Sequence, residues 1–98
     1  MERFAKANEL IAEYEQLEKQ MADPSIHADQ NSARKLGKRY AQLGPVIAGY
    51  RAWKNAEDDL AAGKELAEAD ESFASELASL ETARDAAAEK LEEFHLLN

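Results

Sequence analysis

Apolar side chains recur at steps of three and four residues along most of this chain, the spacing that places them on one face of an α-helix. The first series stops before Asp23 and Pro24, because proline disfavours helical backbone in the residue that precedes it. It predicts a helix over about residues 2–22. Its apolar members are Ala7, Leu10, Tyr14, Leu17 and Met21.

A second series begins near Asp29, whose carboxylate can cap a helix N-terminus, and predicts a helix over about 29–67. The series continues in phase across Gly44 and Pro45, although a proline inside a helix costs about 3 kcal/mol. We therefore expect one long, kinked helix, with a short break at Gly44 as the alternative. Its aromatic members are expected in the core rather than on a platform for bases. The series comprises Leu36, Tyr40, Leu43, Ile47, Tyr50, Trp53, Ala56 and Leu60.

A third series follows a lapse near residues 68–72 and predicts a helix over about 72–96. Its spacing is close to seven residues, which is typical of a helix packed antiparallel against another. A helix of nearly forty residues measures roughly 60 Å. We therefore expect a single all-α domain over 1–98: elongated, with three helices, a long kinked central helix and an antiparallel coiled-coil-like hairpin. The third series comprises Phe73, Leu77, Leu80, Arg84, Ala87, Leu91 and Phe94.

Charge is unevenly distributed along the chain, whose 12 Lys and Arg against 20 Asp and Glu give a net charge of -8. Four cations, Arg34, Lys35, Lys38 and Arg39, share one face of the second predicted helix and are the candidate partner-binding residues. Like charges at this spacing repel, so an anion should offset them. Either carboxylates of the third helix screen them, or an anionic partner such as an RNA backbone or an acidic protein surface binds them.

Residues for catalysis or metal binding do not converge in this sequence. The chain has no cysteine, and its four glycines form no phosphate-binding loop. Consecutive helical residues such as Asp58 and Asp59 point in different directions, and neither His27 nor His95 has a second ligand at helical spacing. We expect no enzyme activity, cofactor, metal or small-molecule substrate. Without a signal peptide or a membrane-spanning apolar run, a cytoplasmic protein with no membrane partner is expected.

Two segments resemble the N-terminal domain of a bacterial class I peptide chain release factor, most closely the type that reads UAA and UAG. They are ADPSIHADQ, residues 22–30, and RKLGKRYAQLGPVIAGYRAWKNAEDDLAAGKELA, residues 34–67. The third predicted helix matches in composition only. The residues that carry the resemblance are Asp23, Pro24, Asp29, Leu36, Lys38, Tyr40, Leu43, Pro45, Tyr50, Leu60, Lys64, Glu65 and Leu66.

The resemblance implies a non-catalytic domain of a translation termination factor. The domains that read the stop codon and carry the Gly-Gly-Gln loop would lie outside this chain. Its implied partners are the ribosome, at ribosomal RNA or protein of the large-subunit stalk base, and the GTP-binding class II release factor. By analogy, the cationic face would make the ribosomal contact. A stand-alone antiparallel coiled-coil adaptor for a protein partner and an independent RNA binder are the alternatives.

Overall fold

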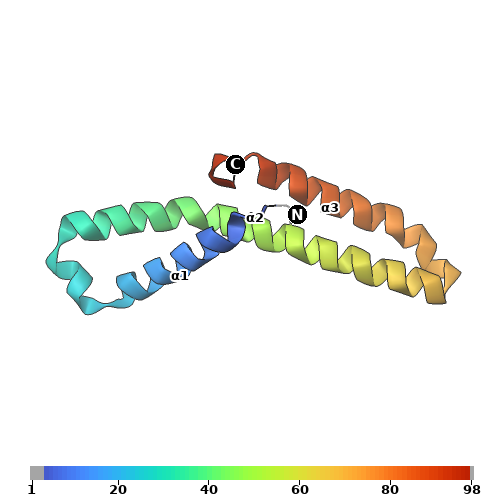
Figure 1. The fold of residues 1–98 in the computed structure, drawn as a ribbon, viewed down its shortest axis with the longest axis horizontal. Coiled ribbons are helices and arrows are strands. Elements are labelled where there is room, and N and C mark those ends of the chain that lie inside the picture. Colours follow the sequence, from blue (N-terminus) through green and yellow to red (C-terminus); the bar gives the residue numbers. More distant parts are fainter. Residues whose placement is uncertain (1–3, 98) are drawn as a thin grey trace. The chain divides into compact units, whose positions relative to one another are not determined.

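The computed structural model describes residues 4–97, which form three α-helices and three short 3₁₀ turns and contain no strand (Figure 1). The prediction of an all-α protein with three helices is therefore confirmed. No helix in these residues is long and apolar enough to cross a membrane. The helices are α1 (Ala7–Ala22), α2 (Gln30–Ala69) and α3 (Leu77–Glu92), and the turns are η1 (Pro24–Ala28), η2 (Glu71–Glu76) and η3 (His95–Leu97).

The chain packs as two compact units that share helix α2. The first unit comprises Met1–Ala48 and Leu96–Asn98, and the second comprises Gly49–His95. In the first unit, α1 runs beside the N-terminal part of α2, and in the second, α3 runs back beside its C-terminal part (Figure 1). Each unit is thus an antiparallel helical hairpin, and the predicted return of the third helix along the second is confirmed.

Helix α1 begins later than the periodicity predicted, at Ala7 rather than near Glu2. Residues 2 and 3 of the predicted helix lie outside the described residues. Phe4 has a φ of 61°, in the left-handed region that L-residues rarely adopt, and such a residue cannot continue a right-handed helix. The Ala7 amide instead donates to the Phe4 carbonyl oxygen at 2.9 Å, which closes a turn ahead of the helix.

Two aspartates organise the connection between α1 and α2. Asp23 has extended backbone before Pro24, which ends α1, and its carboxylate accepts a hydrogen bond from the Ser25 amide at 3.0 Å. Asp29 accepts from the amides of Asn31 and Ser32 at 3.1 and 3.2 Å, and from the Ser32 hydroxyl at 2.8 Å. These bonds satisfy donors that the first turn of α2 would otherwise leave unpaired.

Helix α2 is continuous across Gly44 and Pro45, so the alternative of a break at Gly44 is wrong. Pro45 itself is exposed, whereas three residues around it are almost completely buried: Leu43, Val46 and Ile47 are 0%, 1% and 2% exposed. We attribute the continuity to this burial, which offsets the hydrogen bond that proline cannot donate. The kink at Pro45 stays a prediction.

Helix α3 is shorter than the predicted range of 72–96. Asp70 has extended backbone and accepts from the Ser72 amide at 3.0 Å, and η2 occupies the next six residues. At the other end, the Phe94 amide donates to the Leu91 carbonyl oxygen at 3.1 Å, a bond that spans only three residues. Both ends of the predicted helix are therefore tightened into 3₁₀ geometry, which is common where an α-helix stops.

Two of the four glycines on α2 face large side chains of α3. A methyl group on Gly49 would lie 3.3 Å from Leu91 Cδ1, and one on Gly63 would lie 2.5 Å from Leu80 Cδ1. Because Gly49 and Leu91 are equally distant in sequence from Asp70, this contact also defines the antiparallel register of the second hairpin. The small residues let the two helices approach closely.

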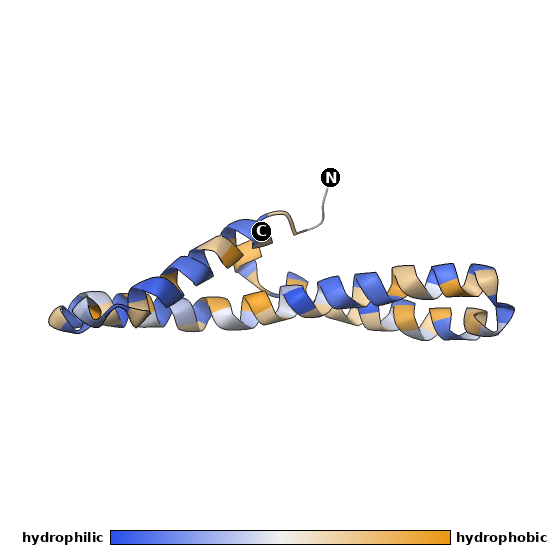
Figure 2. Ribbon diagram, turned by 90° about the horizontal axis from the view of Figure 1, so that it is seen from below, coloured by the Kyte–Doolittle hydropathy of each residue, from blue (hydrophilic) through white to orange (hydrophobic). Residues whose placement is uncertain are grey.

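Apolar residues alternate with hydrophilic ones along every helix (Figure 2), and each unit has its own buried set. The predicted apolar series of α1 and α2 supply most of this core, but Val46, Ala88 and Leu97 lie outside the predicted series. The buried apolar residues are Ala7, Leu10, Leu17, Leu43, Val46, Ile47 and Leu97 in the first unit, and Tyr50, Trp53, Leu60, Ala88 and Leu91 in the second.

Candidate functional site

The four candidate cations divide into two groups in the structure. Arg34, Lys35 and Lys38 are exposed on the N-terminal part of α2, whereas Arg39 is half-buried. None of the three exposed cations forms a salt bridge with another of the residues that the structure describes. We call these three residues the cationic face. Its charges are open to an anionic group from outside the chain.

Arg39 is held within the first hairpin by Glu13 of α1. Its Nε and Nη2 atoms donate to Glu13 Oε2 and Oε1 at 2.6 and 2.9 Å, which is a bidentate pairing. The hydrogen bond from Arg39 lowers the pKa of Glu13, and the same bond raises the pKa of Arg39 above its ordinary value. Arg39 therefore joins two helices, and we do not count it in the cationic face; its role in binding a partner stays a prediction.

Sequence reasoning missed Glu13, although the chain carries a signal that could have found it. Glu13 and Arg39 each lie thirteen residues from Ile26, at the centre of the connection between α1 and α2. Folding the two helices back about that residue places the acid opposite the arginine. One residue further on, the rings of Tyr14 and Tyr40 stack in parallel, with centroids 4.3 Å apart and an angle of 8°.

The aromatic residues of α2 serve packing. Tyr40 is half-buried against Tyr14, and a hydrogen bond with the Tyr14 hydroxyl raises the pKa of Tyr40 to about 12. Tyr50 and Trp53 are 6% and 4% exposed, with ring centroids 5.8 Å apart. The predicted core role of Tyr50 and Trp53 is therefore confirmed, and one face of the Tyr40 ring is occupied by another ring.

A hollow of about 440 Å³ lies beside the cationic face, between the end of α1, η1 and the start of α2. Lys35 and Ser32 contribute to its wall from α2, and Asp23 and Ser25 contribute from the connection. The hydrogen bond from the Ser25 amide lowers the pKa of Asp23, and the bond from the Ser32 side chain lowers that of Asp29. Among the residues that line the hollow, Lys35 carries the positive charge and Asp23 carries a negative one.

The remaining candidate groups stay apart. His27, His95, Asp58 and Asp59 are all exposed, and no group of three or more metal-ligating side chains converges anywhere in residues 4–97. The side chains of the cationic face offer positive charge and hydrogen-bond donors. Such groups can bind an anion, and this surface is accordingly a candidate binding site.

Comparison with known proteins identifies the family. The PCRF domain model matches residues 10–97, which cross both units, and the chain therefore belongs to the PCRF domain family. Curated relatives carry the name peptide chain release factor 1. The protein from Acidothermus cellulolyticus is 50% identical over 88 residues, which are 90% of this chain and 24% of the relative. Those from Streptomyces avermitilis and Streptomyces coelicolor are 51% and 49% identical over 88 residues, 90% of this chain and 25% of each relative.

The resemblance to a bacterial class I release factor of the UAA- and UAG-reading type is thus confirmed. The chain spans about a quarter of the length of the curated relatives that it matches. No solved structure matches the chain.

Proposed function

We propose that this chain is the non-catalytic, N-terminal binding domain of a translation termination factor, and that it binds the ribosome through the cationic face, near the stalk base of the large subunit. The observation that carries the proposal is the presence of three exposed cations, which form no salt bridge with any other residue in 4–97, on a domain of the release-factor family. The proposed setting is the bacterial cytoplasm. Assistance from a GTP-binding class II factor belongs to the same proposal.

Ribosomal RNA is the proposed anion because phosphate groups attract lysine and arginine without needing a shaped pocket. The three residues lie within two helical turns, so they can meet neighbouring phosphates of one backbone. Lys35 also borders the hollow beside η1, where a phosphate or an acidic side chain could enter. A contact of three cations is modest, and its strength should fall as salt displaces it.

Charge reversal in a complete release factor that carries this domain tests the proposal. The test variant combines Arg34→Glu, Lys35→Glu and Lys38→Glu and leaves Arg39 in place. The matched control combines Arg51→Glu, Lys54→Glu and Lys64→Glu, which reverses three exposed cations on the second-unit part of the same helix. Both variants change the net charge equally, so a difference between them reports position and excludes a simple effect of total charge.

Affinity for ribosomes stalled at a stop codon should fall by about tenfold or more for the test variant at low salt, and by far less for the control. The wild-type protein should also lose affinity more steeply with salt than the test variant. Equal affinities of wild type and test variant at low salt would remove the cationic face from the proposal. Equal losses in both variants would point to total charge as the cause.

A further inference from the structure

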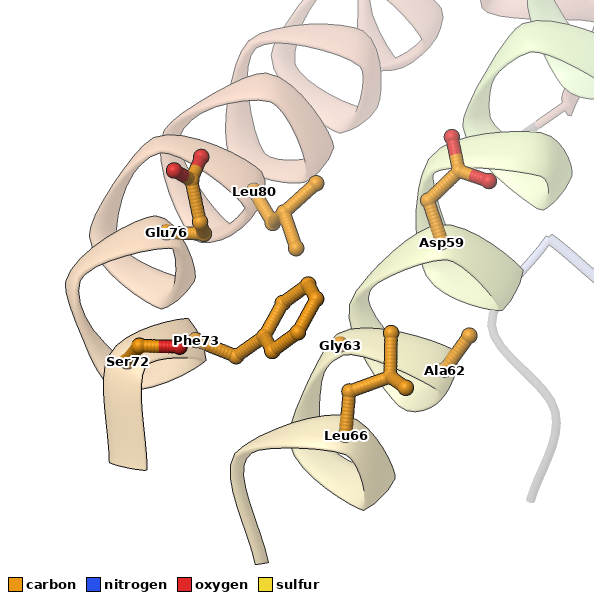
Figure 3. Close-up of a pocket in the computed structure, with 8 residues that line it drawn as sticks. All are labelled: Asp59, Ala62, Gly63, Leu66, Ser72, Phe73, Glu76 and Leu80. Atoms are coloured by element: carbon orange, nitrogen blue, oxygen red, sulfur yellow. The ribbon is translucent and has the colours of Figure 1, made fainter. Parts of the chain in front are cut away.

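An apolar groove lies between α2 and α3 in the second unit, far along the chain from the cationic face. It has a volume of about 440 Å³. The Phe73 ring extends from η2 toward α2, where it faces Leu66 and the bare backbone of Gly63, and Leu80 of α3 forms the next part of the wall (Figure 3). Leu66 is 47% exposed and Phe73 is 37% exposed, so two large apolar side chains are presented to solvent at one place.

Carboxylates border this groove. Asp59 of α2 and Glu76 of η2 contribute to its lining, both are exposed, and neither forms a salt bridge with another residue in the described part of the chain (Figure 3). The second unit as a whole contains thirteen Asp and Glu against five Lys and Arg, which accounts for the entire net charge of -8. The groove is therefore apolar in its floor and acidic at its border.

The charge decides which occupant fits. Nucleic acid and anionic lipid would be repelled by the border. A second copy of this chain seated on the same face would bring two units with this acidic excess together, and like charges across an interface oppose association. A protein segment with a bulky apolar side chain between flanking lysines or arginines complements both the floor and the border.

We propose that this groove is a docking site for a basic amphipathic helix of a protein partner. One apolar side chain of that helix enters between Leu66 and Phe73, and cationic side chains on either side meet Asp59 and Glu76. This is the helix-in-groove mode, in which an apolar anchor supplies affinity and the charged border supplies orientation and selectivity. The site is separate from the cationic face in residues and in chemistry, so it does not depend on the ribosomal proposal.

A designed peptide tests the site on the 98-residue chain. The probe is a fluorescein-labelled helical peptide of about 18 residues, with leucine and phenylalanine on one face and lysine on the other. Its counterpart carries glutamate in place of every lysine. Fluorescence anisotropy gives the affinities, and amide chemical shifts of the labelled chain locate the binding surface.

We expect the lysine peptide to bind and to shift the amides of Gly63 and its neighbours on both sides of the groove, whereas the glutamate peptide should bind at least about tenfold more weakly. Leu66→Glu should weaken binding of the lysine peptide by about tenfold or more. Met21→Glu is the matched control, because Met21 is a similarly exposed apolar residue, at 38%, in the first unit. It should leave the affinity within about twofold.

Reversing the two border charges completes the test. Asp59 and Glu76 are both exposed, so their substitution should not disturb the packing of the helices. Asp59→Lys combined with Glu76→Lys should weaken the lysine peptide and strengthen the glutamate peptide. The matched control, Glu81→Lys with Glu89→Lys, makes the same charge change at exposed positions of α3 outside the groove lining. The proposal is overturned if neither peptide binds, if shifts spread over the acidic surface of α3, or if each variant and its control have equal effects.

Discussion

The two hairpins use the same long helix but are closed by different side chains. In the first, α1 meets α2 through the stacked rings of Tyr14 and Tyr40 and the bidentate pair of Glu13 and Arg39. In the second, the contact at Gly63 brings the α2 backbone close to leucine side chains of α3. In the first hairpin the helices are joined by large side chains with polar ends. In the second, they come close at Gly63 because glycine has no side chain.

Charge separates the two hairpins as well. The first unit holds seven Lys and Arg against seven Asp and Glu, and the second holds five against thirteen. The bulk charge of -8 thus describes only the second unit. A neutral first unit can present a local cationic face to an anion, while the acidic second unit favours a basic partner. The two proposed surfaces therefore carry opposite charges.

The largest expected effect comes from the core leucines. Leu43→Ala and Leu91→Ala each remove a side chain that is 0% exposed, so each should lower the free energy of unfolding by about 2–5 kcal/mol in urea titrations. Hydrogen exchange should localise the damage, with α1 losing protection first in Leu43→Ala and α3 first in Leu91→Ala. Identical protection patterns would mean that the two hairpins unfold as one unit. Leu66→Ala, at an exposed position, should cost less than about 1 kcal/mol.

A pair of glycine substitutions should give effects of opposite sign. Gly63→Ala places a methyl group 2.5 Å from Leu80 Cδ1, so the leucine must rotate, and we expect a loss of about 1–3 kcal/mol. Gly37→Ala meets no heavy atom within 4 Å and should raise stability by about 0.5–1 kcal/mol through helix propensity. Thermal and urea unfolding measure both. If Gly63→Ala stabilised the chain as much as Gly37→Ala, close approach at Gly63 would not hold the second hairpin.

A smaller effect is expected from the pair of Glu13 and Arg39. A double-mutant cycle with Glu13→Gln and Arg39→Gln should give a coupling of about 0.2–1 kcal/mol, because both side chains are about one-third exposed. The pKa of Glu13 is lowered from 4.5, so this contribution is present above pH 4.5 and is lost as the pH falls through the lowered value. Arg84 and Asp85, adjacent residues of α3, form the control pair and should show almost no coupling.

A separate effect should come from the aspartates that cap the turns. Asp29 accepts three hydrogen bonds at the start of α2, and Asp70 accepts one from Ser72 before η2, so Asp29→Ala should lower Tm more than Asp70→Ala. Both pKa values are lowered from 3.8 by these bonds. The stabilisation is therefore full above pH 3.8 and fades as the pH falls through the lowered values. A pH-independent Tm difference between wild type and Asp29→Ala would contradict this account.

Much of the fold could be predicted because helical periodicity is a local property. The apolar series on α1 and α2 predicted helices and most of the buried residues, and the in-phase pattern across Pro45 predicted a continuous α2. The 3₁₀ geometry before α3 was missed. The Asp70 carboxylate accepts a hydrogen bond from the Ser72 amide and so favours a local turn over an α-helix, and the spacing of apolar residues carries no information about such a bond. The burial of Val46 was missed for a related reason, since one periodic series describes one face only.

The candidate site was predictable only in part. Spacing alone placed Arg34, Lys35, Lys38 and Arg39 on one face, and family resemblance suggested what such a face could bind. The spacing could not reveal that Arg39 forms an ion pair with Glu13, because Glu13 lies twenty-six residues earlier in the chain. The groove at Leu66 and Phe73 was likewise hidden, because the spacing placed Phe73 in an apolar series, left Leu66 outside one and does not show how exposed either side chain is.

The amino-acid sequence by itself determined three helices, the apolar face of each, the position of the cations and the family, because these depend on residue spacing and identity along the chain. Tertiary structure alone decided which cation forms an ion pair within the chain, at which glycine a larger residue would clash with the neighbouring helix, and which apolar residues remain exposed. Those properties depend on how closely two helices approach, and that distance is set by residues far apart in sequence.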